Sequence, residues 1–240
     1  MPTHAVEARD QVRDLSRSLI RQVANEAMNT PGVLPFHFGE SDQPTPEFIR
    51  RAGMASLERG ETFYTQSLGR PWLREGLSHY LSGLLCTTVP VERIAVIGSG
   101  VTGVMLTAQL LLSPGDRVVA VTPLWPNALE IPRVMGARVT TVGLQNRNGR
   151  WALDVERLIG ALTPDTRLLI LNSPNNPTGW AMDAEARDAI LAHCRRLGIW
   201  IMGDDVYERL IYDGSRVTPT FLANYQDGDR IISVNSFSKT

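Results

Sequence analysis

Several short segments in the second half of the chain carry residue types that can do chemistry. Lys239 lies in SFSK among small hydroxyl residues, and a partly desolvated lysine amine can act as a nucleophile. Asp204 opens the segment DDVY, where a buried carboxylate needs a partner or a shifted pKa. The segment SPNNPTG at 173–179 offers two asparagine amides from a loop that proline and glycine make rigid. Taken singly, each segment also fits an ordinary turn or surface.

The segment GSGVTG at 98–103 matches the GxGxxG spacing between an apolar run and a helical pattern. A dinucleotide site also needs an acidic residue at the end of the next strand, about 20 residues on. That strand ends in AVTP at 120–123, so a dinucleotide oxidoreductase is disfavoured, although it stays an alternative. A glycine-rich turn into a helix N-terminus can still hold a phosphate through backbone N–H groups, or can be a tight turn without a ligand.

Two other features have a functional and a bland interpretation. Trp125 stands between two prolines, where it is either buried filler or a flat face against a planar ligand. The pair Asp204-Asp205 would suit the metal site of a phosphate-loop hydrolase, but the sequence has no GxxxxGK[ST] segment to accompany it. The histidines and cysteines show no ligand spacing, so we predict no metal site.

The segments share one position, because each follows an aliphatic, β-branched run. These runs predict strands at 94–98, 117–121, 138–142, 167–172, 199–203 and 230–235, alternating with helices at 101–112, 126–135, 154–162 and 183–197. The alternation predicts an α/β fold with a mostly parallel sheet flanked by helices, and ligands bind beyond the carboxyl ends of such strands. Asp154 and Asp183 are expected N-caps. The first part of the chain predicts helices at 10–29, at 46–59 and from Pro71, and a short strand at 34–38.

Composition limits the class of protein. The chain has 240 residues, 43% of them hydrophobic, and a net charge of −1, as in a soluble globular protein. Without a basic field it predicts no nucleic-acid partner and no membrane partner. Two cysteines outside any CxxC pattern predict a reducing compartment. A charged N-terminus without an apolar run predicts no signal peptide, and we therefore expect a cytoplasmic location.

In combination, SPNNPTG, DDVY and SFSK, in this order and at these strand ends, resemble the class I/II aminotransferases. These are pyridoxal-phosphate (PLP) enzymes of the aspartate aminotransferase fold, fold type I. The resemblance runs from about Leu34 to the last residue, and it includes FGESDQPTP and YTQSLGRPWLR in the first part of the chain. PLP is the cofactor that the resemblance implies.

The resemblance also implies a role for each matching residue. Lys239 would be the Schiff-base lysine and proton shuttle, and Asp204 would keep the ring nitrogen protonated. Tyr207 and Asn176 would hydrogen-bond the phenolic oxygen of the ring, and Asn176 also lies near the substrate. The implied catalytic residues are thus Lys239, Asp204 and Tyr207.

Further residues match cofactor-binding and substrate-binding positions of the family. The phosphate would be held by the backbone of Gly100, Val101 and Thr102 and by the hydroxyl of Ser236, while Trp125 would stack on the ring. Tyr64 would reach the phosphate of the neighbouring subunit, which implies a homodimer. Gly39 would lie near the substrate carboxylate.

The implied function is transfer of an amino group between an amino acid and a 2-oxo acid. A PLP-dependent carbon–sulfur lyase, an aminocyclopropane-carboxylate-synthase-like enzyme and an inactive PLP-binding fragment remain alternatives, since they share these residues. We expect an N-terminal helix and substrate-side loop segment at 1–45 and an incomplete PLP-binding large domain at 46–240, with the small domain largely missing. The sequence ends one residue after Lys239, which we interpret as a truncation of a longer chain.

Overall fold

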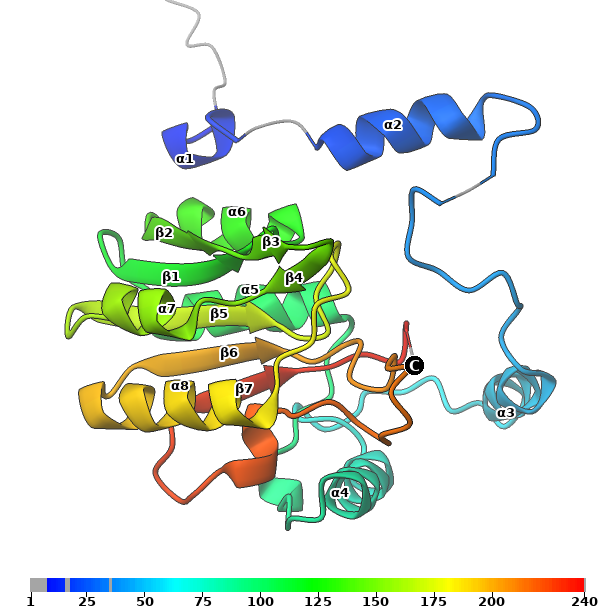
Figure 1. The fold of residues 1–240 in the computed structure, drawn as a ribbon. Coiled ribbons are helices and arrows are strands. Elements are labelled where there is room, and N and C mark those ends of the chain that lie inside the picture. The colour runs from blue at the N-terminus through cyan, green and yellow to red at the C-terminus, as the bar shows by residue number, and fades with distance from the viewer. Residues whose placement is uncertain (1–7, 16–17, 35, 240) are drawn as a thin grey trace, which may run out of the picture. The chain divides into compact units, whose positions relative to one another are not determined.

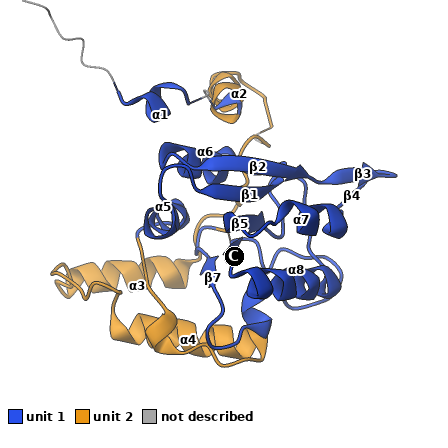
Figure 2. Cartoon of the chain, turned by 90° about the vertical axis from the view of Figure 1, so that its left-hand side faces the viewer, with its two compact units in different colours: residues 1–19, 98–238, 240 blue, residues 20–97, 239 orange. Residues whose placement is uncertain are grey.

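The computed structural model describes residues 8–15, 18–34 and 36–239. The chain divides into two compact units, which Figure 2 distinguishes by colour. Unit 1 comprises residues 98–238 with the N-terminal residues up to 19, and unit 2 comprises residues 20–97 with Lys239. Among the helices of the described residues, none is long and apolar enough to cross a membrane.

Unit 1 is built on a five-stranded parallel sheet in the order β2-β1-β5-β6-β7 (Figure 1). Its strands are β1 (Arg117–Thr122), β2 (Arg138–Gly143), β5 (Thr166–Asn172), β6 (Trp200–Asp204) and β7 (Ile231–Val234). The register places Asn172 at the end of β5 opposite Asp204 at the end of β6. The predicted parallel α/β sheet is confirmed, and five of its strands fall within two residues of the expected bounds.

Helices cover both faces of the sheet, as the aliphatic strands require. Helices α5 (Gly100–Leu111) and α6 (Pro126–Val134) share a core with Val118, Ala120 and Ile170. Helices α7 (Val155–Ala161) and α8 (Ala184–Leu197) share the other core with Val119 and Leu169. Because successive strand residues point to opposite faces, each central strand contributes to both cores.

Local signals set the ends of the helices. Asp154 accepts a hydrogen bond from the Arg157 N–H and Asp183 accepts one from the Ala186 N–H, so both expected N-caps are confirmed. Gly198 ends α8 with a φ of 68°, in the left-handed region that glycine adopts without strain.

Three expectations were wrong. Residues 94–97 form no strand, because their backbone makes isolated bonds to Leu68 and Arg74 instead of a ladder. The described residues of 34–38 form no strand and include a turn at 36–37, and the Phe36 N–H bonds the nearby carbonyl of Leu34. Instead of one helix at 10–29, the chain has α1 (Asp10–Arg13) and α2 (Leu19–Met28); residues 16 and 17, between them, lie outside the described residues. Asp and Ser compete for backbone hydrogen bonds, and Asp14 ends the first helix.

A hairpin of β3 (Gln145–Arg147) and β4 (Arg150–Ala152) was not predicted. Its turn is Asn148-Gly149, with φ values of 55° and 79°. Asn-Gly is the preferred sequence of a two-residue hairpin turn, because both central residues need positive φ. The dipeptide was therefore a readable signal, although the flanking strands are only three residues long.

Unit 2 contains α2, α3 (Glu47–Glu58), α4 (Pro71–Leu85) and a short 3-10 helix, η1 (Val91–Arg93). The expected helix starts at Pro46 and Pro71 are confirmed, with Pro46 as N-cap and Pro71 in the first turn. Gly69 has a φ of 98°, and a Cβ atom there would lie 2.6 Å from the Cβ of Val96. The glycine in YTQSLG is therefore required by both conformation and space. A second 3-10 helix, η2 (Phe221–Asn224), belongs to unit 1.

The double-sided core gives a stability prediction. Leu169 is fully buried in β5, so Leu169→Ala should lower the free energy of unfolding by about 2–5 kcal/mol through lost burial and a cavity. The matched control is Leu210→Ala, whose side chain is 43% exposed and whose effect should stay within about 0.5 kcal/mol. Urea unfolding of the three proteins measures both values. Equal effects of the two substitutions would contradict this assignment of the core.

Candidate active site

The loops after β1, β5, β6 and β7, together with the start of α5, bring most of the predicted site residues into unit 1. The strands are parallel, so their carboxyl ends lie at one edge of the sheet (Figure 1). The residues placed in these segments are Gly100, Val101, Thr102, Trp125, Asn176, Asp204, Tyr207 and Ser236. Lys239, Gly39 and Tyr64 belong to unit 2.

Asp204 is a buried carboxylate with an unused oxygen. The residue is only 6% exposed, and its Oδ1 has no hydrogen-bond partner among the described residues. Burial raises the pKa of Asp204 from 3.8 to about 6, while a hydrogen bond from the Val206 backbone acts in the opposite direction. A buried acceptor without a donor is costly, so this atom is suited to bind a cationic N–H group.

Asn176 and Tyr207 form a pair of polar groups. The Asn176 Nδ2 lies 3.4 Å from the Tyr207 Oη, to which it donates. Burial and the nearby Asp204 charge raise the pKa of Tyr207, and the bond from Asn176 lowers it. The phenol therefore stays protonated at neutral pH. Two donors this close together can both hydrogen-bond one oxygen atom of a ligand.

Sequence reasoning missed Asn172, which bonds both Asp204 and Asn176. Asn172 is 1% exposed; its Nδ2 donates to the Asp204 carbonyl at 2.8 Å and its Oδ1 accepts from the Asn176 N–H at 2.7 Å. The signal was available, because a polar residue ending an otherwise aliphatic strand must find partners. The neighbouring Asn175 donates to the Pro123 carbonyl at 3.1 Å and so ties this loop to the one carrying Trp125.

The start of α5 has the features of an anion site. Ser99 is the N-cap and accepts from the Thr102 N–H at 3.3 Å, a weak bond with which an anion could compete. A Cβ atom built on Gly100 would lie 3.6 Å from the Cβ of Ser236, so the turn and the Ser236 hydroxyl are neighbours. Val101 is 39% exposed. The described backbone and hydroxyl together suit a phosphate group.

The remaining predicted residues have the following positions. Trp125 is partly buried against the core formed by α5 and α6, at the N-cap position of α6. In unit 2 the Lys239 ammonium donates to the Gly39 carbonyl. Tyr64 is fully exposed.

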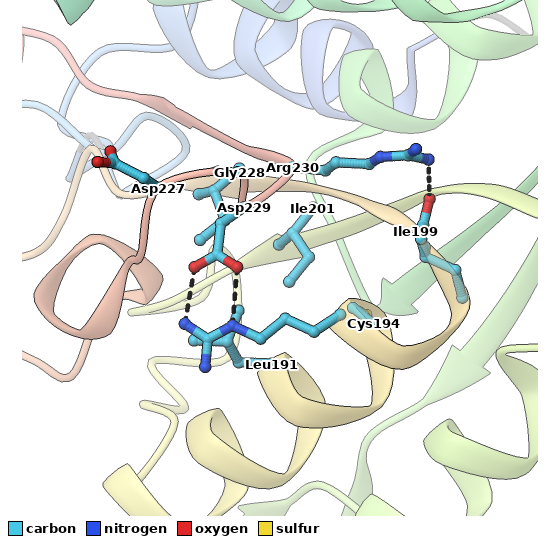
Figure 3. A pocket seen from close by; sticks show the side chains of 11 residues that line it. Leu191, Cys194, Ile199, Ile201, Asp227, Gly228, Asp229 and Arg230 are labelled. Carbon is cyan, nitrogen blue, oxygen red and sulfur yellow. Dashed lines mark hydrogen bonds and ion pairs between the residues drawn. The ribbon is translucent and has the colours of Figure 1, made fainter.

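A cavity of about 360 Å³ lies at the opposite end of the sheet, between the end of α8 and the starts of β6 and β7. Its lining includes Cys194, Ile199 and Asp229 (Figure 3). Both Asp229 oxygens are bonded by the guanidinium of Arg195 at 2.7 Å, and burial raises the pKa of the Cys194 thiol to about 12. Paired charges and an unreactive thiol give this cavity no role in the chemistry at the other edge.

The parallel sheet has polar residues at the carboxyl ends of its strands. This defines an α/β protein of the class that binds ligands beyond those strand ends. A family model described as "Aminotransferase class I and II" matches residues 31–240, and the chain belongs to this family, whose members depend on PLP. The expected family and fold class are thereby confirmed.

Individual relatives agree with this membership. The chain is 30% identical to an aspartate aminotransferase of Pyrococcus horikoshii, over 96% of this chain and 58% of the relative. It is 30% identical to an arginine–pyruvate transaminase of Pseudomonas aeruginosa, over 87% of this chain and 52% of the relative. The structure of a Thermus thermophilus aspartate aminotransferase with maleate matches with a TM-score of 0.86 at 28% identity, over 97% of this chain and 61% of that one. The chain thus spans between half and two thirds of the length of these proteins.

Asp204 gives a pH prediction. An acid whose pKa is raised on folding binds more protons in the folded state, so its stabilising contribution is greatest at low pH. That contribution is lost as the pH rises from 3.8 to about 6. The variant Asp204→Asn should therefore gain stability relative to the wild type over this range, by at most about 3 kcal/mol.

Urea unfolding of both proteins at pH 4, 5, 6 and 7 (about one-unit steps spanning the two pKa values) measures this difference. Asp42→Asn, which removes an exposed carboxylate of unit 2, is the control. A stability difference between Asp204→Asn and the wild type that does not change with pH would contradict the assigned pKa.

Proposed function

We propose that this protein is a PLP-dependent aminotransferase that moves an amino group between an amino acid and a 2-oxo acid. The observation that carries the proposal is the unpartnered, buried Oδ1 of Asp204 in a chain of this family. A protonated pyridine nitrogen is the partner that such an atom lacks. The relatives named above act on aspartate or on arginine and pyruvate by their names, which supports substrates of these two classes.

The described residues fit the cofactor group by group. Asp204 would hold the ring nitrogen, and Asn176 and Tyr207 would hold the ring oxygen. The phosphate would be bound by the backbone of residues 100–102 and by the Ser236 hydroxyl, with Trp125 on the ring face. Lys239 would hold the cofactor covalently. When bound, PLP supplies an electron sink for the carbon next to the substrate nitrogen.

The contribution of the protein is to hold charges and move a proton. The Asp204 carboxylate, once paired with a cation, has its pKa lowered again and stays ionised, so that it keeps the bonded nitrogen protonated. The Lys239 Nζ, when uncharged, can accept the proton from the substrate Cα and then donate that proton to a different atom. Asn176 and Tyr207 fix the orientation of the ring by donating to one oxygen.

We further propose a homodimer, a cytoplasmic location and the division into segments 1–45 and 46–240. A second copy is supported by the apolar surface of unit 2, where α3 has no buried residue and exposes Phe48, Met54 and Leu57 by 57% or more. Tyr64 in the same unit is fully exposed, as a residue that reaches into a partner must be. Cys86 and Cys194 are free thiols, which suits a reducing compartment.

Covalent cofactor binding can be tested unusually cleanly, because Lys239 is the only lysine in the sequence. Addition of PLP should produce a visible absorption band, and borohydride should then fix the cofactor on the peptide that contains Lys239. Lys239→Ala should abolish both. Lys239→Arg is the matched control, since it keeps the positive charge but lacks a nucleophilic amine. A folded wild-type protein without the band would overturn cofactor binding.

Product analysis tests the reaction type. With PLP, an amino acid and a 2-oxo acid, we expect the amino group on the second acid, and no transfer with Lys239→Ala. Release of ammonia with a sulfur compound, or of a cyclopropane amino acid, would identify the lyase or the synthase-like alternative instead. Covalent PLP binding without any product would identify an inactive PLP-binding chain.

A further inference from the structure

Two buried carboxyl groups, Asp205 and Glu208, have no part in the chemistry described above. They follow Asp204 in the turn after β6 and are 5% and 3% exposed. Burial raises the pKa of Asp205 to about 7 and also raises the pKa of Glu208. Buried acids of this kind are costly unless they are hydrogen-bonded, so the identity of their partners indicates what they do.

Both acids bind side chains in or just after the edge strand β7. The Ser233 hydroxyl donates to the Asp205 Oδ2 at 2.5 Å, and the Asn235 Nδ2 donates to the Glu208 Oε1 at 2.8 Å. The contact of Glu208 differs from that of Asp205, because Asn235 makes a further hydrogen bond. The Oδ1 of Asn235 accepts from the Ser236 backbone N–H at 2.7 Å.

The last member of this chain of bonds lies at the expected phosphate site. Ser236 neighbours Gly100 at the start of the 12-residue helix α5, with 3.6 Å between the Ser236 Cβ and a Cβ built on Gly100. The Ser236 hydroxyl is also bonded to Ser238, whose N–H donates to it at 3.1 Å. The backbone at Ser236 therefore decides how its hydroxyl meets the helix start.

The direction of these bonds depends on Glu208. An ionised carboxylate only accepts hydrogen bonds, so the ionised form of Glu208 holds the Asn235 amide as the structure has it, with its NH2 group toward Glu208 and its oxygen toward Ser236. In the flipped amide, two acceptors would face each other at Glu208 and two donors would meet at the Ser236 N–H. The buried acid thus selects one of two amide orientations.

We propose that Glu208 and Asn235 are positioning residues for the phosphate of the cofactor, with Glu208 acting on Ser236 through Asn235. This inference rests on the proposed function, since it assigns the Ser236 hydroxyl to the phosphate of PLP. It concerns the phosphate alone, because the chain of bonds ends at Ser236.

Reversing the polarity of one bond tests the inference. Asn235→Asp keeps an acceptor for the Ser236 N–H but places a carboxylate against Glu208. Adding Glu208→Gln restores a donor–acceptor pair in the opposite direction and returns the net charge to that of the wild type. The readouts are the dissociation constants of PLP and of pyridoxal, which lacks the phosphate.

We expect Asn235→Asp to weaken PLP binding about tenfold, with less than about a twofold change for pyridoxal, and the double variant to regain most of the loss. If Asn235→Asp does not fold, Asn235→Ala removes both bonds without adding charge, and the same selective loss is expected. Ser233→Ala is the matched control: it removes the other contact between the same two segments but does not reach Ser236. It should lower the thermal unfolding temperature while leaving the ratio of the two constants unchanged.

The outcomes separate this inference from the proposed function. A wild-type protein that binds neither compound overturns both. A wild type that binds PLP, with variants that lose PLP and pyridoxal equally or lose neither, overturns the positioning role alone. The positioning role is also overturned if the double variant does not regain PLP affinity and Asn235→Ala leaves the ratio of the PLP and pyridoxal dissociation constants unchanged.

Discussion

The arrangement of the carboxyl edge depends on one electrostatic constraint, a carboxylate placed at the end of a buried strand with an oxygen left unpartnered. Burial of the carboxylate away from water disfavours its charged form, which is why the pKa of Asp204 rises to about 6. The Val206 backbone N–H offsets this penalty only in part, and Asn172 bonds the backbone carbonyl of Asp204, not its side chain. A strand end built in this way would be stabilised by a cationic partner, because the unpartnered carboxylate costs stability on its own.

The groups around Asp204 are held by the strand register and by hydrogen bonds of short asparagine side chains, and not by long flexible side chains. The register of β5 and β6 puts Asn172 opposite Asp204, and the Asn172 amide then fixes the backbone of Asn176. Asn175 extends the same network to the loop before Trp125. Each link is buried or half-buried, so a missing partner would leave an unsatisfied polar group. The polar groups around Asp204 are therefore held in place by the sheet itself.

The sequence predicted the features that depend on residues close together in the chain, but not those that depend on residues far apart in it. Strand and helix positions followed from local periodicity, and the Asp154 and Asp183 caps followed from a side chain three residues from its partner. The segment at 94–97 was wrong because a strand exists only where a neighbour pairs with it, and an aliphatic run does not reveal its neighbour. The hydrogen bonds of Asn172, Asp205 and Glu208 were not predicted, for a related reason. Their partners lie 4–32 residues away, across the sheet or in the next turn, and only the register brings them together.

Asp205 and Glu208 also explain why three acids can occupy one turn. Their charges are of the same sign, and those of Asp204 and Glu208 both raise the pKa of Asp205. Three ionised carboxylates in this space would repel one another strongly, so the turn is tolerable only if each acid has a separate means of neutralisation. Asp205 meets this condition by holding a proton near neutral pH, next to Ser233. The charge of Glu208 is stabilised by the hydrogen bond from the Asn235 amide and by the positive charge of Arg209. Asp204 has neither, and among the described residues its buried Oδ1 has no hydrogen-bond partner, so a cationic group bound there would neutralise it.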